Sequence, residues 1–464
     1  MRRQAAFAVL SLCLAPSVSP AQRKPVESLA RAVLTELVAI NTTVSEGATT
    51  PAAEKLAARF RAVGFPTADV LVIGPTPKHK NLVVTWRGKT RGKPIVFNAH
   101  LDVVEAPKLE WSTNPFQLTE KDGWLYGRGV LDDKGPASAM IAAFLSAKKS
   151  GLTPQRDLVL ALTSGEESDV DNGVMWLLKN RRALVDGEYV LNLDAGGGDV
   201  DHGVVRAFAV QAAEKVYMDV TLTARGPGGH SSLPHDESPI DHLARALDRL
   251  GRFRFPVKLN NVVRAYLERR APLTPGVEGA AMLALAHDPN DLTAQTTLLK
   301  TPQMNAQLRT TCVATMLRGG SAPNAMPQEV VATVNCRILP GEPVDAVLDL
   351  LRTAVNDTSV KVAVLQAATP SAPSIPPAAM VSMLERVVGS IYPHTPVIPF
   401  MENGATDGLW FRNAGIPVYG VAGFFVESVV HERMHGRDER IPVKAYSDMV
   451  RYSVQLLTEA ASQR

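Results

Sequence analysis

Hydrophobic residues follow a helical period and a strand period in turn along the first half of the chain. Apolar positions recur every three or four residues over Val26–Ile40 and Pro51–Val63, which predicts two amphipathic helices. Short apolar runs predict buried strands at Asn81–Trp86, Pro94–Asn98, Leu158–Leu162 and Tyr189–Leu193. Further helices are predicted between them, at Gly135–Lys149 and Gly173–Asn180. Strands that alternate with helices favour a mostly parallel sheet covered by helices.

The pattern changes after about residue 214. Val216–Ala224 alternates between apolar and polar residues, as a strand with one exposed face does, and Ile240–Arg252 has the period of an amphipathic helix. A helical stretch interrupted by prolines runs to about residue 301, and strand-like runs follow at Gln307–Leu317 and Glu329–Ile338. This segment predicts an inserted α+β domain that ends near residue 341.

Beyond residue 341 the alternation resumes, at Val360–Leu365, Ala378–Tyr392, Val397–Met401, Ile416–Val421 and Lys444–Thr458. The expected fold class is therefore α/β, a helix-covered, mostly parallel sheet interrupted by a smaller α+β domain. We expect the main domain at residues 22–213 and 342–464, and the inserted domain at residues 214–341.

Composition excludes several classes of protein. The 464 residues are 45% hydrophobic and 20% charged, which excludes a disordered, collagen-like or disulfide-stapled chain. A net charge of +3 without any basic block gives no reason to expect a nucleic-acid or anionic-membrane partner. Three cysteines without a CxxC pair exclude a thiolate zinc site, so any metal must be held by histidines and carboxylates.

The N-terminus has the layout of a secretory signal peptide. Arg2 and Arg3 precede the apolar run Ala5–Ala15, and small residues allow cleavage after Ala21. We therefore expect residues 1–21 to be removed and the protein to be exported, to the periplasm or outside the cell. The apolar run is too short for a membrane span. Lipidation at Cys13, a twin-arginine route and an uncleaved segment are the alternatives.

Two of the cysteines, Cys312 and Cys336, lie in the strand-like runs of the inserted domain. If those runs pair as a hairpin, the two residues fall nearly opposite each other, and a bridge is conceivable in an oxidising compartment. We expect them to remain unpaired.

Histidines and carboxylates gather where predicted strands end, which is where α/β sheets carry their sites. His100 ends one strand, and Asp102 follows closely enough to hold the imidazole; a hydrogen-bonded core histidine is the alternative. Asp132 and Asp133 lie between glycines just before a helix, where one of them could be only a helix cap.

Three later clusters add further ligand candidates. Glu166 and Glu167 follow an apolar strand, so one could bind a metal while the other accepts a proton; a solvated turn is the alternative. Asp194 ends another strand beside glycines, and His435 lies late in the chain, where an i,i+4 pair with His431 is a rival arrangement. Oxygen and nitrogen donors without sulfur suit a hydrolytic site with one or two zinc ions or a similar metal.

The order of these motifs resembles the co-catalytic zinc metallopeptidases that include aminoacylase, carboxypeptidase S, succinyl-diaminopimelate desuccinylase and acetylornithine deacetylase. The resemblance runs from about Leu29 to Ala461 and implies two zinc ions per subunit, with cobalt or manganese as substitutes. The implied metal ligands are His100, Asp132, Glu167, Asp194 and His435, with Asp132 bridging both ions. Asp102 would orient His100, Asp133 would be a neighbour, and Glu166 would be the general base and acid.

The inserted domain resembles the family's lid and dimerisation domain, which implies a homodimer. His230, in Gly228-Gly229-His230-Ser231-Ser232, matches the histidine that in relatives reaches the partner subunit's site and stabilises the oxyanion. Asn324 and Arg337 match residues that grip the substrate's carboxylate, a task that suits the planar guanidinium. The loop that ends at Asp407 also matches a family loop near the site, as structural support.

The stretch Arg264–Thr301 looks most like the carboxypeptidase S and N-acyl-amino-acid hydrolase branch. This implies a metal-dependent hydrolase that cleaves an amide bond next to a free carboxylate by two-metal water activation, in a small peptide or an N-acyl amino acid. Asp194 stands where several carboxypeptidase and deacylase relatives have Glu, which leaves a dipeptidase or aminopeptidase of the same family as the alternative. A catalytically inactive metal-dependent binding protein is a remote alternative.

Overall fold

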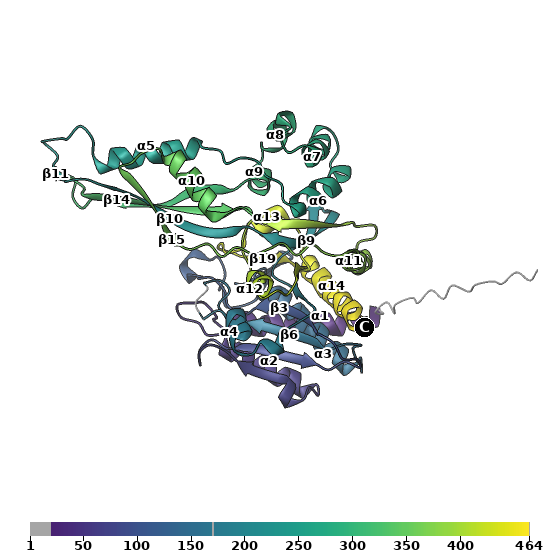
Figure 1. Ribbon diagram of the computed structural model, residues 1–464. Coiled ribbons are helices and arrows are strands. Elements are labelled where there is room, and N and C mark those ends of the chain that lie inside the picture. The colour runs from purple at the N-terminus through teal and green to yellow at the C-terminus, as the bar shows by residue number, and fades with distance from the viewer. Residues whose placement is uncertain (1–19, 169–170, 464) are drawn as a thin grey trace, which may run out of the picture.

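The protein is described here by a computed structural model that covers residues 20–168 and 171–463 (Figure 1). The expected signal peptide, residues 1–21, lies almost wholly outside the described residues and stays a prediction. Within the described part of the chain, no helix combines the length and the apolar character needed to cross a membrane.

Ten strands form one large sheet whose centre is parallel, as expected from the alternation of strands and helices. The order at the centre is β6 (Leu158–Thr163), β3 (Ile95–His100), β7 (Tyr189–Asn192) and β17 (Val418–Gly420), each parallel to its neighbour. Residues alternate between the two faces of each strand: Leu158 and Leu160 belong to one hydrophobic core, and Val159 between them belongs to another. Both faces are therefore covered, which explains the continuous apolar runs.

Strands that pair in both directions extend this sheet at both edges. One edge carries β2 (Asn81–Trp86) and β1 (Val70–Ile73). The other carries β9 (Val204–Glu214), β8 (Gly197–Asp201) and β18 (Phe425–Glu427), with β16 (Val397–Glu402) paired to β9. The hairpin of β8 and β9 was not predicted, because glycines and acids interrupt its apolar pattern.

Helices cover the two faces unequally. The larger core lies under α1 (Pro20–Ala39), α2 (Thr50–Ala62), α3 (Lys134–Lys149), α11 (Ala378–Gly389) and α14 (Val443–Ser462). The opposite face is covered by α4 (Gly173–Asn180) and α12 (Gly408–Asn413). A small separate sheet joins β4 (Thr119–Lys121), β5 (Trp124–Tyr126) and β19 (Arg440–Pro442), and α13 (Ser428–His431) precedes the last of them.

The second domain projects to one side of the large sheet (Figure 1). Its four-stranded antiparallel sheet has the order β12 (Thr311–Gly319), β14 (Glu329–Ile338), β10 (Val216–Arg225) and β15 (Val360–Gln366). Two helices, α5 (Pro239–Arg252) and α10 (Val344–Val355), share its core. The short strands β11 (Gly229–His230) and β13 (Ala325–Met326) pair in a separate sheet toward its outer end.

The expected limits of the inserted domain, residues 214–341, differ from the structure in two ways. First, α10 and β15 belong to the second domain, since β15 pairs with β10, so that domain extends to Gln366. Second, the helices between Asn261 and Leu308 pack on the large sheet, where their core includes Ala212 and Met401. These helices are α6 (Asn261–Arg270), α7 (Val277–His287), α8 (Leu292–Leu298) and α9 (Pro302–Leu308). Local periodicity shows that a helix exists, but the surface it packs against depends on distant residues.

The expectation that Cys312 and Cys336 stay unpaired is wrong. The two residues are directly opposite each other in the antiparallel pair of β12 and β14, and they form a disulfide. Their Cα atoms are 4.0 Å apart, because facing residues of an antiparallel pair come this close at the narrow positions of the ladder.

Candidate active site

The candidate ligands meet at the carboxyl ends of the central parallel strands. His100 is the last residue of β3, Glu166 and Glu167 follow β6, and Asp194 follows β7. Since these strands are neighbours and run in the same direction, their loops gather at one edge of the sheet. Asp132 reaches the same edge from the loop that leads into α3.

Asp132 joins the two candidate histidines. Its Oδ1 lies 2.8 Å from Nε2 of His100, and its Oδ2 lies 2.9 Å from Nε2 of His435. Although burial acts to raise the pKa of Asp132, the hydrogen bonds from these two histidines hold that pKa well below its usual range. The hydrogen bonds to Asp132 and Glu167 raise the pKa of His435 to about 10. His435 also lies 3.1 Å from Oε2 of Glu167.

The cluster has the composition of a metal site. Ligand atoms of His100, Asp132 and Glu167 lie within 4.8 Å of one another, and so do those of His100, Asp133 and Asp194. Among the described residues, Asp132, Glu167 and Asp194 form ion pairs with histidines, and no carboxylate of these sets pairs with a Lys or Arg side chain. Burial raises the pKa of Glu167 to about 7, and it also raises the pKa of Asp133 and of Asp194.

Unsatisfied oxygens support the same interpretation. Oδ1 of Asp133 and Oε1 of Glu167 are buried without a hydrogen-bond partner among the described residues. A buried carboxylate oxygen that lacks a hydrogen-bond partner is costly unless it binds a metal. Oxygen and nitrogen donors in this number fit hard or borderline divalent cations such as zinc.

The contacts of Asp102 and Asp133 differ in detail from those expected from the sequence. Nδ1 of His100 lies 3.0 Å from the backbone carbonyl oxygen of Asp102, whereas the Asp102 carboxylate is 3.8 Å away. The residue thus orients the imidazole through its main chain, and its Oδ2 accepts from the backbone N–H of Glu167 over 3.1 Å. Asp133, expected only as a neighbour, accepts from the backbone N–H of His100 over 3.1 Å and belongs to one ligand set.

The rival pair of His431 with His435 is not formed. Helix α13 ends at His431, and the ring of His431 packs edge-on against Phe424 with 5.4 Å between the ring centroids. Burial lowers the pKa of His431. His435 adopts a left-handed backbone conformation beyond the helix, with φ of 61°, and faces Asp132 instead.

Glu166 lies next to the ligand cluster and lines the same cavity as Asp132, Glu167 and Asp194. Burial raises the pKa of Glu166 well above its usual value, and the nearby Asp194 adds to this effect. A carboxyl group in such surroundings can take up a proton more readily than an exposed one.

Asp407 holds the loop that carries Glu166. Its Oδ2 accepts from Oγ1 of Thr163 over 2.9 Å at one end of that loop, and its Oδ1 accepts from Nδ2 of Asn172 over 2.8 Å at the other end. Burial raises the pKa of Asp407 to about 7. These contacts agree with the supporting role expected for this loop, whose partners could not be identified from the sequence.

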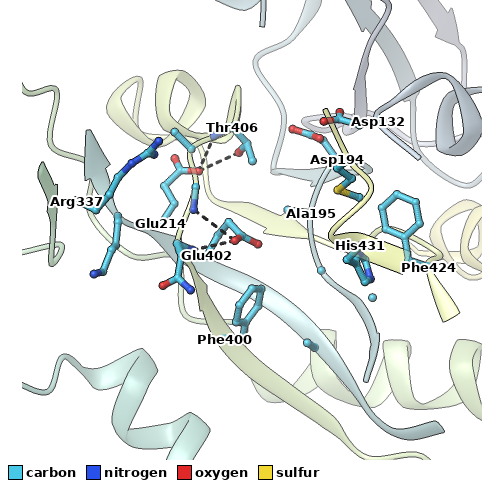
Figure 2. Close-up of a pocket in the computed structure, with 18 of the residues that line it drawn as sticks. Asp132, Asp194, Ala195, Glu214, Arg337, Phe400, Glu402, Thr406, Phe424 and His431 are labelled. Carbon is cyan, nitrogen blue, oxygen red and sulfur yellow. Dashed lines mark hydrogen bonds between the residues drawn. The ribbon is translucent and has the colours of Figure 1, made fainter. Parts of the chain in front are cut away.

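A cavity of about 1070 Å³ connects the ligand cluster with the second domain. Figure 2 shows Asp132 and Asp194 on one side of it, Arg337 and Glu402 on the other, and Phe400 and Phe424 in its apolar walls. The guanidinium of Arg337 lies 4.6 Å from the ring centroid of Tyr217, its neighbour on β10. Of the two residues expected to bind the substrate's carboxylate, Arg337 and Asn324, it is Arg337 that lines this cavity in the described part of the chain.

His230 and Asn324 lie elsewhere. His230 is exposed in β11, and its Nδ1 lies 2.8 Å from Oγ of Ser232. Asn324 is exposed beside β13, and its backbone oxygen accepts from the N–H of Ser231. Neither lines the cavity within the described part of this chain.

Sequence reasoning missed one pair beside the ligands, the buried Arg128 and Glu439. Arg128 stands four residues before Asp132 in the sequence, and Glu439 stands four residues after His435. An Arg and a Glu are common on protein surfaces, and only their meeting in space shows that they are buried together.

Most of the chain is similar in sequence to known proteins. The sequence model of the family described as peptidase family M20/M25/M40 matches residues 96–459. The N-fatty-acyl-amino acid synthase/hydrolase PM20D1 of Homo sapiens is 30% identical over 379 residues, which cover 79% of this chain and 74% of that protein. Probable carboxypeptidase S-like 2 of Dictyostelium discoideum is 28% identical over 390 residues, with 81% and 74% covered.

Solved structures share the fold. Human carnosine dipeptidase 1 superposes with a TM-score of 0.70 at 16% identity and covers 96% of this chain and 100% of its own. The M20 family metallo-carboxypeptidase Sso-CP2 from Sulfolobus solfataricus superposes with a TM-score of 0.68 at 18% identity, with 93% and 99% covered. At sequence identities of 16% and 18%, the similarity to these two structures shows a shared fold alone.

Proposed function

Because the chain belongs to peptidase family M20/M25/M40, we propose that it hydrolyses N-acyl amino acids at the amide bond next to their free α-carboxylate. The protein is a metal-dependent amide hydrolase of the carboxypeptidase S and N-acyl-amino-acid hydrolase branch. One observation carries the choice of substrate: Arg337 and the ligand cluster line the same cavity. A guanidinium suits the carboxylate of a substrate whose amide reaches the cluster.

Two divalent cations, preferentially zinc, are proposed for the cluster. His100 and Asp194 would hold one, Glu167 and His435 would hold the other, and Asp132, which contacts both histidines, would bridge them. Bound cations would supply Lewis-acid polarisation of the scissile carbonyl and of the attacking water. Cobalt and manganese accept the same donors and would serve as substitutes.

The chain's own side chains transfer the proton, position the other site residues and bind the substrate. Glu166 takes a proton from the attacking water on its carboxylate and returns it to the leaving nitrogen. Asp102 keeps the His100 ring in place through its carbonyl oxygen, and Asp407 holds both ends of the Glu166 loop. Arg337 orients the substrate by its carboxylate.

The acyl group would lie along the apolar walls of the cavity. Ile398, Phe400 and Val426 line this part, beside the small residues Ala207 and Ala209. The human relative bears the name of an N-fatty-acyl-amino acid synthase/hydrolase, and these walls suit an apolar acyl chain in the present protein as well.

A homodimer is part of the proposal. The edge strand β12 exposes Val313, Met316 and Leu317, which are 61%, 69% and 69% exposed, and a second copy could cover them. In such a dimer the partner subunit's His230, which lies far out on the second domain, would donate a hydrogen bond to the developing oxyanion. Asn324, which lies close to His230, would assist in binding the substrate's carboxylate.

Export after cleavage near Ala21 is also proposed. The disulfide between Cys312 and Cys336 supports it, because such bonds persist in oxidising compartments.

The test is steady-state hydrolysis by the zinc-loaded mature protein of N-acyl amino acids, dipeptides, and the same compounds with the carboxylate amidated. We expect cleavage of the N-acyl amino acids and none of the amidated compounds. If cleavage requires a free amine instead, the protein is a dipeptidase or aminopeptidase. If nothing is cleaved while the metal is bound, the proposal fails.

A further inference from the structure

Arg128 and Glu439 form a buried ion pair beside the metal-binding cluster. Nη1 of Arg128 donates to Oε2 of Glu439 over 2.7 Å, and the two side chains are 2% and 0% exposed. Neither residue lines the active-site cavity within the described part of the chain, so neither contacts a substrate there. A buried ion pair is favourable only when further hydrogen bonds satisfy both groups. Their other partners therefore show what the pair holds in place.

Glu439 holds the backbone that leads into Asp132. Its Oε2 accepts from the N–H of Gly129 over 2.9 Å. Its Oε1 accepts from the N–H of Leu131 over 2.7 Å and from the N–H of Asp132 over 3.2 Å. One carboxylate thus fixes three peptide groups of the segment whose last residue contacts both His100 and His435.

Arg128 holds the backbone around His435. Its Nη2 donates to the carbonyl oxygens of His435 over 3.3 Å and of Gly436 over 2.9 Å, and to the carbonyl oxygen of Glu105 over 3.3 Å. His435 has a φ of 61°, a left-handed conformation that a residue other than glycine keeps only when its surroundings require it. The guanidinium also lies 5.0 Å from the ring centroid of Trp111, which restricts its position further.

Each residue of the pair therefore holds a segment that carries a proposed ligand of the same cation. The two segments are more than 300 residues apart in the sequence. We propose that Arg128 and Glu439 are positioning residues that set the separation of Asp132 and His435, and thereby the affinity for the cation bound by Asp132, Glu167 and His435. The inference rests on the proposed two-metal function. The cation at His100 and Asp194 depends less on the pair, because His100 is the end of a central strand and is held by the sheet.

The experiment measures zinc binding rather than activity. Wild-type protein and the variants Glu439→Gln and Arg128→Lys are freed of metal and titrated with zinc, and bound metal is counted by elemental analysis. Gln keeps the shape of Glu439 but turns an N–H group toward the backbone donors. Lys has a single donor nitrogen, so it cannot reach both the Glu439 carboxylate and the carbonyl oxygens that Arg128 holds through its two terminal nitrogens. Cobalt absorption spectra of the same proteins report the coordination of each ion. The variant His435→Ala provides the reference for loss of one ligand.

Arg412→Lys is the matched control. Arg412 forms an equally buried pair with Glu214, with both side chains 2% exposed, and it hydrogen-bonds Gln211 rather than a ligand segment. It should lose a comparable amount of thermal stability without any change in zinc binding.

We expect two zinc ions per chain in the wild type, of which one binds about 10–100-fold more weakly in Glu439→Gln and in Arg128→Lys, as for other residues that orient metal ligands. Wild-type affinity for both ions in Arg128→Lys, the milder change, would overturn the inference even if Glu439→Gln does not fold. Equal weakening in Arg412→Lys would also overturn it, since the effect would then follow from stability alone. A wild-type protein that binds two ions but hydrolyses no amide refutes the proposed function and leaves this inference standing.

Discussion

Oδ2 of Asp132 lies 2.9 Å from Nε2 of His435, although the two residues are 303 positions apart in the sequence. The other oxygen of the same carboxylate contacts His100, so a single side chain joins proposed metal ligands from two distant parts of the chain. A substitution that moves the segments of Asp132 and His435 apart should therefore weaken metal binding even when the protein still folds.

Replacing Glu166 by Gln should separate chemistry from metal binding. The amide cannot accept a proton from water, so kcat should fall by about 10²–10⁴-fold, the usual contribution of a general base. Both cations should remain, because Glu166 is not among the proposed ligands. Steady-state rates and elemental analysis test this, with Glu385→Gln on the exposed face of α11 as the control. Substantial residual turnover in Glu166→Gln would exclude this residue as the base.

Replacing Arg337 by Met should remove the preference for a free carboxylate. We expect kcat/KM for N-acyl amino acids to fall by about 10²–10³-fold, since a charged hydrogen-bonded contact is lost. The matched amidated compounds should react as slowly as with the wild type. Arg225→Met, in an exposed pair with Glu329, is the control for loss of an Arg from the second domain. An equal loss on both kinds of compound would indicate a general structural effect.

His230 should act across subunits. The variants His230→Ala and Glu166→Gln should each be nearly inactive alone. When the two are co-expressed, a mixed dimer has one site with an intact Glu166 and the partner subunit's His230, and up to about half of the activity per such dimer should return. Size-exclusion chromatography with light scattering must show a dimer. Co-expressed variants that are no more active than the two alone would show that His230 does not complete the partner's site.

The metal-free protein should lose stability as the pH rises from about 4.5 to about 7. Burial raises the pKa of Glu167 and of Asp407 to about 7, so the folded chain holds protons that the unfolded chain has already released in this window. A raised carboxyl pKa therefore stabilises the folded state at the acidic end and ceases to do so near pH 7. Urea unfolding at pH 4.5, 5.5 and 7 measures this. Zinc should reverse the trend, because its ligands must be deprotonated; a metal-free protein that becomes more stable toward pH 7 would contradict the prediction.

The disulfide should stabilise the second domain. Cys312 and Cys336 close a loop with a sequence separation of 24, and the double variant Cys312→Ala with Cys336→Ala should lose about 2–4 kcal/mol of the free energy of unfolding. A thiol reductant should destabilise the wild type and leave the double variant unchanged. An absence of any reductant effect on the wild type would mean that the bond does not form.

Much of the fold could be predicted from local patterns. The predicted strand Asn81–Trp86 and helix Gly173–Asn180 coincide with β2 and α4. A short apolar run is typical of a strand buried on both faces, and a longer run of helix-forming residues is typical of a helix. The hairpin of β8 and β9 lacks such a pattern and was missed. The C-terminal end of the second domain was misplaced because α10 and β15 look locally like elements of the main domain and differ only in their partners.

The sequence by itself determined which residues stand where strands end, and with them the candidate ligands, because the order of elements already brings parallel strand ends to one edge. Only the tertiary structure decided that Asp102 orients His100 through its carbonyl oxygen, that Asp133 lies in a group of side chains that could hold a metal, and that Cys312 meets Cys336. It also decided that Arg128 and Glu439 are buried together. Contacts between residues hundreds of positions apart leave no local pattern, since they depend on the final packing of segments whose own sequences are ordinary.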